Sequence, residues 1–559
     1  MFVSDDWVFT PIAWLDGWYY VGYGYQYLDP SFQPHNYKIS RLPWVLYQFV
    51  FRQLFAPITA SYLIQFSCLA LAALSVFFTC RRLRFGNLAS FVASAFLMTY
   101  GWYVGPGNGG ADYHNTLAAP LYAATFLLTT FAASSPHRLW LLMAAGAAYG
   151  LTVHTSVFYL NFVPVLVLQF ITVRRDVYPY VETVKRYIVG LVAGGFGITV
   201  LLAIVNRLAG RSFAFFRPMF EMSWRFATDN ASLTPWWKPW SAWFWEANYL
   251  PLLIAGVAFA AATILIARRA NKEATGRQAA SVGYQYLFLV SLWVFWQAVG
   301  KTTLDYFYFA HPLIVPLALA IAALIAVTQK SRDLTWRQGL LIAGLFAGCL
   351  MGGTWIKHIF GIYVSNNQFA SSLGLALIGC VAITAALRWR VAFILGLCSL
   401  SLAKDVSHTF ANAFERGNCL QARSGFSAAV RAHLLLTGNH SGDQIFVWFD
   451  DRDPEKVVLQ ESCVGDKSSR SFAMSLTATG FQYLDPPWEG MNDIDVISAA
   501  NIRRALTRNA YIALVTARGS TVDRLVQRAT GLGIRTRRDG PYVVEQTPYR
   551  ITIYMVKPV

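Results

Sequence analysis

Acidic and basic side chains that suit group-transfer chemistry gather near the N-terminus of this 559-residue chain. Asp16 stands beside the aromatic run Gly17-Trp18-Tyr19-Tyr20, and Lys38 and Arg41 follow before a long series of apolar segments. A carboxylate can take a proton from an attacking hydroxyl, and a guanidinium can hold a phosphate through two parallel hydrogen bonds. Placed in a loop beside a membrane, these groups indicate a reaction site for a lipid-borne anionic substrate.

Two further polar segments stand just before apolar spans. Asp112 and His114 lie in the first, and Lys301 begins the second. Asp112 supplies a second carboxylate, and Lys301 a third cation for a phosphate. A simpler explanation is that interfacial Asp, Lys, Tyr and Trp residues anchor the spans, and we favour it for single residues except Asp16, Asp112 and Arg41. The second segment also carries Tyr306, Tyr308 and His311, which we expect to line the same cavity.

The composition is that of a membrane protein. Hydrophobic residues make up 55% of the chain and charged residues only 13%, against about 25% charged in soluble domains. The mean hydropathy is +0.40. The net charge of +17 is explained by basic cytoplasmic loops, so we expect the lipid bilayer, and no nucleic acid, as a partner.

Apolar segments predict about twelve membrane crossings, or about thirteen if a first helix precedes this start. Residues 139–155 and 156–173 have almost no polar loop between them. This region can therefore form either two spans or one bent helix. The basic clusters favour two spans. The predicted spans are 58–80, 88–104, 116–133, 139–155, 156–173, 187–208, 249–267, 282–300, 310–328, 338–356, 369–387 and 391–404.

With these spans, the Arg and Lys clusters all fall on one side of the membrane, which the positive-inside bias makes the cytoplasm. Residues 1–57 and the C-terminus then lie outside, as do all three candidate polar segments. No signal peptide is visible at the start, so we expect a first transmembrane helix to be missing from it. The clusters are Arg81 to Arg84, Arg174 to Arg186, Arg268 to Arg277, Lys330 to Arg337, and Arg388 with Arg390.

A change in composition near residue 404 predicts two domains: a membrane module over 1–404 and a soluble α/β domain over 405–559. Gln444–Phe449 and Tyr511–Val515 read as strands, and Thr521–Leu532 as an amphipathic helix. Arg538–Pro541 predicts a turn between two more strands. Cys419 and Cys463 lie in this outer domain, so we expect them to be bonded.

Several motifs occur in a recognisable order. Asp16 is followed four residues later by Tyr20, then Arg41 precedes Leu42-Pro43, Asp112 starts a span, and a Tyr-rich loop leads into a helix with paired prolines. In this order, and on one side of the membrane, they resemble the GT-C superfamily of membrane glycosyltransferases. They resemble in particular the bacterial branch with the aminoarabinose and protein-mannosyl transferases. The resemblance covers the first 330 residues.

The resemblance implies inverting transfer of a sugar from a polyprenyl-phosphate donor to a glycan, lipid or protein acceptor. The reaction would take place at the periplasmic face of a bacterial inner membrane. It implies Asp16 as catalytic base, Arg41 on the donor phosphate and Asp112 orienting a substrate. Many relatives have Asp-Glu where this chain has Asp16-Gly17, and Ser40 replaces an expected acid. The sequence therefore assigns no metal ligands and leaves a divalent cation open.

Two functions from other classes compete with an enzyme. A transporter or flippase of lipid-linked sugars would place charged residues at the bilayer midplane and show repeat symmetry. A non-catalytic assembly protein would serve to present the C-terminal domain. The ionisable residues here gather at one surface and no repeat is visible, which favours an enzyme.

The predicted topology can be tested by labelling. Cysteines substituted for His35 and His440 should both react with an impermeant thiol reagent in intact spheroplasts, because both loops are expected outside. Cysteine at Arg175, in a predicted cytoplasmic loop, is the control and should react only after lysis. Protection of either outer site would contradict the topology.

Overall fold

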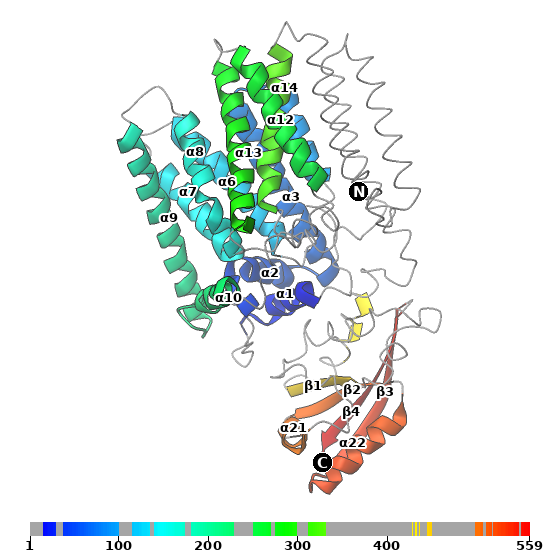
Figure 1. Ribbon diagram of the computed structural model, residues 1–559. Coiled ribbons are helices and arrows are strands. Elements are labelled where there is room, and N and C mark those ends of the chain that lie inside the picture. The colour runs from blue at the N-terminus through cyan, green and yellow to red at the C-terminus, as the bar shows by residue number, and fades with distance from the viewer. Residues whose placement is uncertain are drawn as a thin grey trace, which may run out of the picture.

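The chain is a multi-pass helical membrane protein with a small C-terminal α/β unit (Figure 1). The computed structural model describes residues 15–28, 37–99, 114–134, 139–173, 180–228, 250–269, 274–298, 311–330, 427–428, 431–432, 435, 444–449, 498–506, 510–516, 518–546 and 549–559. The predicted spans 338–356, 369–387 and 391–404 lie outside these residues, as do Cys419 and Cys463.

Two kinds of helix build the membrane part. Short helices at one end are α1 (Leu15–Gln26), η2 (Tyr37–Ser40), α2 (Leu42–Leu54) and α10 (Arg217–Thr228). The remaining helices form the bundle: α3 (Pro57–Arg82), α4 (Asn87–Thr99), α6 (Asn115–Ser134), α7 (Leu139–Thr155), η3 (Val157–Phe162), α8 (Val163–Val173), α9 (Tyr180–Leu208), α12 (Leu250–Arg269), α13 (Ala274–Ala298) and α14 (His311–Lys330).

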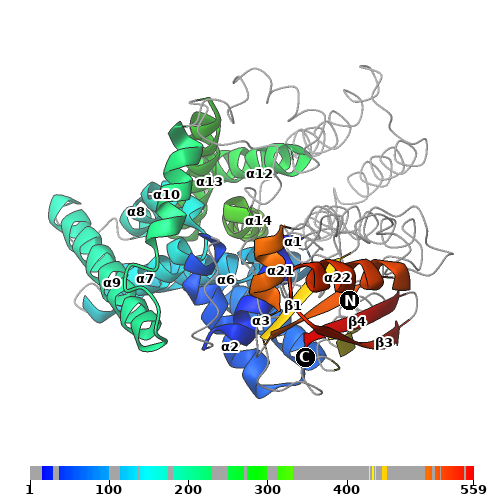
Figure 2. The same ribbon diagram turned by 90° about the horizontal axis from the view of Figure 1, so that it is seen from below.

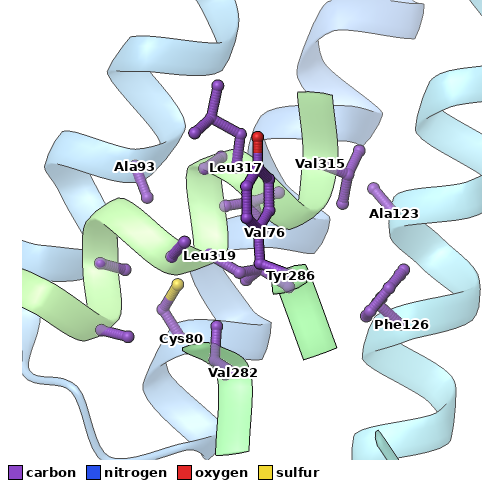
Figure 3. Packing of buried hydrophobic residues seen from close by; sticks show 14 of the residues in the cluster. Val76, Cys80, Ala93, Ala123, Phe126, Val282, Tyr286, Val315, Leu317 and Leu319 are labelled. Carbon is purple, nitrogen blue, oxygen red and sulfur yellow. The ribbon is translucent and has the colours of Figure 1, made fainter. Parts of the chain in front are cut away.

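Four described helices are long and apolar enough to cross a bilayer: Pro57–Arg82, Asn115–Ala133, Val184–Leu208 and His311–Gln329. The His311–Gln329 span is buried along its whole apolar window, whereas Val184–Leu208 is mostly exposed. Helix α14 is therefore central and α9 peripheral, as Figure 1 shows. In Figure 3, residues of α14 meet apolar side chains of α3, α4, α6 and α13, among them Val76, Ala93, Phe126 and Tyr286.

Helices α7 and α9 run parallel, which decides between two spans and one bent helix at 139–173. Gly190 of α9 lies against Leu142, and Gly194 one turn later lies against Ala147. Further along, His154 Nε2 is 2.7 Å from Thr199 Oγ1. Residue numbers therefore increase in the same direction along both helices. The segment between them, η3 and α8, must return the chain across the bundle. The predicted pair of spans is confirmed.

The two ends of α6 mark the two ends of the bundle. Its first turn follows His114, which contacts Arg41 at the start of α2. Near its last turn, the Phe131 ring lies 5.4 Å from the Arg82 guanidinium, at the end of α3. The basic cluster after α3 and the candidate polar residues thus lie at opposite ends, as the charge pattern predicts.

The C-terminal unit is a four-stranded sheet with order β1-β2-β4-β3, in which only β1 and β2 are parallel. Helices α21 (Ala499–Ala505) and α22 (Gly519–Gly531) pack with one face of the sheet. The other face contributes Tyr511 and Met555 to the buried cluster that contains Tyr20 of α1. Figures 1 and 2 place the sheet beyond the end with α1 and α2. The strands are β1 (Gln444–Phe449), β2 (Ala510–Val515), β3 (Thr536–Gln546) and β4 (Tyr549–Pro558).

The predicted turn at Arg538–Pro541 is wrong. These residues belong to β3, and the pairing of β3 with β4 shifts register between Asp539 and Tyr542. Gly540 has φ +100°, a conformation that glycine adopts without steric cost. The Gly-Pro pair therefore makes a bulge inside one long strand rather than a turn between two strands.

The packing of α7 on α9 predicts a strong dependence on Gly194. A Cβ added there would overlap main-chain atoms of Met143, whereas one added at Gly197 meets nothing within 4 Å. Gly194→Ala should lower the free energy of unfolding by about 1–3 kcal/mol, because backbone atoms of a packed helix cannot give way. Thermal unfolding in detergent measures this, with Gly197→Ala as control. Equal stability of the two variants would contradict the close packing.

Candidate functional site

Arg41 is held at a junction of two helical segments. Its backbone N–H donates to the Lys38 carbonyl oxygen at 3.2 Å, and its own carbonyl accepts from Trp44 N–H at 3.0 Å. Pro43, in the first turn of α2, has no N–H to satisfy and suits a helix start. The short sequence from Lys38 to Trp44 thus fixes where the Arg41 side chain begins.

The Arg41 guanidinium lies against the His114 imidazole at the start of α6. Its Nη1 contacts both ring nitrogens of His114. The guanidinium also lies 5.8 Å from the ring centres of Tyr20 and Tyr37. The Tyr20 and His114 rings pack with centroids 5.6 Å apart. Residues 73 positions apart in sequence are therefore brought into one site.

Close packing of α1 on α2 places Tyr20 there. Tyr20 and Tyr23 of α1 and Tyr27, just after its last residue, are spaced three and four residues apart and are all buried. They therefore lie on one aromatic face, which continues past the end of the helix. At Gly24, between them, a Cβ would come within 2.8 Å of Gln48 Cβ on α2. The glycine lets the two helices approach and so presents Tyr20 to Arg41.

The site is buried and basic. Lys38 is 8% exposed, His114 3% and His311 1%. Burial lowers the pKa of His114 well below its usual value, and the charges of Arg41, His311 and Lys38 lower it further. The imidazole is therefore neutral at neutral pH and can accept a hydrogen bond from Arg41. Lys38 and Arg41 bring two basic side chains to the site, and a cluster of basic groups attracts an anion.

The structure does not describe the side chains of the two acidic residues expected at the site. Asp16 belongs to α1, one helical turn before Tyr20. Asp112, Lys301, Tyr306 and Tyr308 lie outside the described residues. The carboxylates whose side chains are described belong to α9, α10 and the C-terminal unit: Glu182, Glu221, Asp523, Asp539 and Glu545.

Five sequence-predicted residues, taken from four separate segments, do come together. Tyr20, Lys38, Arg41 and His311 all act on His114, through ring packing, a direct contact or their charge. In the part of the chain that the structure describes, no three histidine, cysteine or acidic side chains gather as metal ligands.

Two features of the site are not evident from the sequence. Tyr37 stands next to Lys38, but no motif distinguishes it from other interfacial tyrosines. Arg211, just after α9, donates from Nε and Nη2 to the Tyr27 carbonyl oxygen at 3.1 and 3.0 Å. The Tyr27 hydroxyl in turn donates to Asn206 at 3.1 Å. This clamp fixes the end of α1, and no local pattern around Arg211 signals it.

Comparison with solved structures gives the fold. ArnT from Cupriavidus metallidurans bound to undecaprenyl phosphate matches over 99% of this chain and 95% of its own, with TM-score 0.53 and 14% identity. The chain has the fold of ArnT. The expected resemblance to GT-C enzymes is thus confirmed for the fold. No protein-family profile matches the chain, nor does any curated protein.

Two other structures match less well. ArnT from the same organism in the apo state has TM-score 0.49 and 14% identity, over 98% of this chain and 94% of its own. The Archaeoglobus fulgidus oligosaccharyltransferase in the apo form has TM-score 0.37 and 14% identity, over 70% of this chain and 52% of its own. Both TM-scores lie below 0.5, so neither structure supports the fold assignment.

Proposed function

We propose that this protein transfers a sugar from a polyprenyl-phosphate donor to an acceptor at the outer face of a bacterial inner membrane. The observation that carries the proposal is the contact of the half-buried Arg41 with His114, near the buried Lys38 and beside the aromatic face of α1. It lies at one end of a membrane bundle with the fold of ArnT, which was solved with a lipid phosphate bound. The acceptor is a glycolipid, polysaccharide or protein.

Each group has a role in an inverting transfer. Asp16 takes the proton of the acceptor hydroxyl as that oxygen attacks the anomeric carbon. The bond from that carbon to the phosphate oxygen breaks, and its electron pair stays on the phosphate. Arg41 and Lys38 stabilise the charge that builds there, because preorganised cations in a buried site act strongly on developing charge.

The remaining predicted residues complete the cavity in this proposal. Asp112 orients the donor or acceptor, and Tyr20 packs beside the bound sugar or phosphate. Lys301, Tyr306, Tyr308 and His311 line the donor side. Residues 1–404 form the catalytic module and 405–559 a periplasmic domain.

A flippase of lipid-linked sugars is the main alternative, and the charge distribution supports an enzyme instead. The ionisable groups of the site lie at the ends of α2, α6 and α14 rather than at mid-span. Purified protein in detergent separates the two functions, because a flippase has no membrane to act across there. Sugar transfer in detergent from a polyprenyl-phosphate sugar would support the enzyme, and repeated failure with all donors tried would contradict it.

The base assignment predicts the effect of Asp16→Asn. Transfer should fall by about 10²- to 10⁴-fold, the usual contribution of a general base, while gel filtration shows a folded protein. Glu182→Gln is a matched control, since Glu182 is an exposed acid that pairs with Arg186 at 3.1 Å on α9. Activity of Asp16→Asn near that of the control would reject this base.

The phosphate assignment predicts a different effect for Arg41→Ala. Losing one charged hydrogen-bonding group should weaken donor binding by about 10- to 100-fold. Arg217→Ala serves as control, because Arg217 is exposed and pairs with Glu221 at 2.6 Å on α10. Titration of a fluorescent polyprenyl-phosphate sugar measures the affinity of both variants. Unchanged affinity in Arg41→Ala would place the phosphate elsewhere.

A further inference from the structure

Two buried polar side chains between α2 and α3 carry hydrogen-bonding groups that have no partner among the described residues. Trp44 and Gln65 are both 0% exposed. Within the described part of the chain, no group bonds to the Trp44 indole N–H or to either end of the Gln65 amide. Buried polar groups are nearly always hydrogen-bonded, because an unpartnered group has lost its bonds to water without replacing them. Two such side chains in one region therefore point to a ligand that completes their hydrogen bonds.

Helices α2 and α3 are antiparallel neighbours, and two contacts fix their register. The Tyr47 hydroxyl lies 2.6 Å from Ser67 Oγ, and Arg52 Nη1 donates to Ser61 Oγ at 3.4 Å. Earlier residues of α2 therefore lie opposite later residues of α3. The turn of α3 after Ser61 thus faces the turns of α2 before Arg52.

Trp44 and Gln65 occupy those facing turns. Gln65 is one turn after Ser61 on α3, and Trp44 is two turns before Arg52 on α2. Residues four apart share a face of a helix, so both side chains belong to the interface between α2 and α3. Trp44 is also in the same buried cluster as Cys68, one turn after Gln65. The indole and the amide therefore lie in one region of this interface.

Gln65 lies at the same level of the bundle as His114. Helices α3 and α6 pack against each other, and the Phe131 ring of α6 lies 5.4 Å from the Arg82 guanidinium at the end of α3. Phe131 comes 17 residues after His114, and Gln65 comes 17 residues before Arg82. Because a helix rises about 1.5 Å per residue, both are about 26 Å from that contact. The unpartnered amide is thus at the depth of the contact between His114 and Arg41.

We propose that the Gln65 amide and the Trp44 indole N–H bind hydroxyl groups of the sugar on the polyprenyl-phosphate donor. This inference rests on the proposed function and assigns residues that recognise the sugar, while Arg41 and Lys38 bind the phosphate. The sugar is bonded directly to that phosphate, so it must lie next to Arg41. Trp44 is in the adjoining turn, since its backbone N–H donates to the Arg41 carbonyl oxygen at 3.0 Å.

The chemistry of the two groups suits hydroxyls better than a second phosphate. A side-chain amide both donates and accepts hydrogen bonds, and an indole N–H only donates. A sugar hydroxyl also donates and accepts, so neighbouring hydroxyls can satisfy the whole amide. An ionised phosphodiester only accepts, and it would leave the Gln65 side-chain oxygen unpartnered.

Recognition of this kind makes affinity depend on the sugar. A bound sugar supplies partners for Gln65 and Trp44, whereas a lipid phosphate without a sugar leaves both groups unpartnered. A site built to bond a hydroxyl rejects ligands that lack it, because its own buried groups are then unsatisfied. Once the sugar has moved to the acceptor, this part of the affinity for the lipid is lost. The arrangement therefore favours release of the product lipid.

Binding of two charge-matched lipids to the full-length protein in detergent tests the inference. The first probe is the polyprenyl-phosphate hexose, hexosamine or pentose that gives the fastest transfer in the detergent assay. The second is the methyl ester of the same polyprenyl phosphate. Both contain a singly charged phosphodiester, so the ratio of their dissociation constants measures the contribution of the sugar.

The wild type should bind the sugar lipid more tightly than the methyl ester. Gln65→Leu, which replaces the amide by an apolar side chain, should reduce that preference by about 10-fold and leave the affinity for the methyl ester unchanged. Trp44→Phe, which keeps an aromatic ring but removes the N–H, should reduce the preference in the same direction. This second variant decides the matter if Gln65→Leu does not fold.

A stability measurement separates binding from packing. Without lipid, Gln65→Leu should unfold at a higher temperature than the wild type, because it removes an unpartnered buried amide. Gln169→Leu is the matched control, since Gln169 is a buried glutamine of α8 whose Nε2 donates to the Phe126 carbonyl oxygen at 3.2 Å and to Thr130 Oγ1 at 2.6 Å. That variant should unfold at a lower temperature and keep the wild-type preference for the sugar lipid.

Three results would overturn the inference. Equal affinity of the wild type for the two lipids would show that the sugar makes no such bonds. An unchanged preference in Gln65→Leu and Trp44→Phe would assign these groups to packing, and equal weakening of both lipids would give them a structural role. In each case, sugar transfer by the wild type would leave the proposed function standing. Failure of every probe to bind, together with absence of transfer, would reject the proposed function itself.

Discussion

The contact between Arg41 and His114 is the constraint on which the site depends. It joins the loop before α2 to the first turn of α6, and α6 runs the length of the bundle to the basic end of α3. Arg41 is half-buried, and a charged group that loses part of its water needs polar partners in the protein. The helices must therefore be placed so that α2 and α6 begin side by side, and the tight approach at Gly24 brings Tyr20 of α1 to the same point.

Much of the fold follows from the sequence because apolar length and loop charge are local properties. The predicted spans 139–155 and 187–208 correspond to α7 and α9, and Gln444–Phe449 is β1 to the residue. The parallel packing of α7 on α9 brings Gly190 against Leu142 and Gly194 against Met143, and no local pattern pairs residues so far apart in the sequence. The bulge at Gly540 was mistaken for a turn because Asp-Gly-Pro suits both.

The candidate site, like the fold, could be predicted from the sequence only in part. Sorting polar residues to one side of the membrane is enough to group Lys38, Arg41, His114 and His311, since all stand at span ends. Their mutual contacts depend on how the helices tilt and pack, so the direct Arg41–His114 contact could not be predicted. Arg211 was missed for the same reason: its partner is a backbone carbonyl 184 residues away.

The central claim is that this basic site binds the phosphate of a polyprenyl lipid. A cryo-electron microscopy structure of the wild-type protein with polyprenyl phosphate tests it most directly. The account predicts phosphate density in contact with Arg41 and Lys38, with His114 beside it. Phosphate density elsewhere, such as against Arg81 and Arg82 at the opposite end of the bundle, would contradict the account.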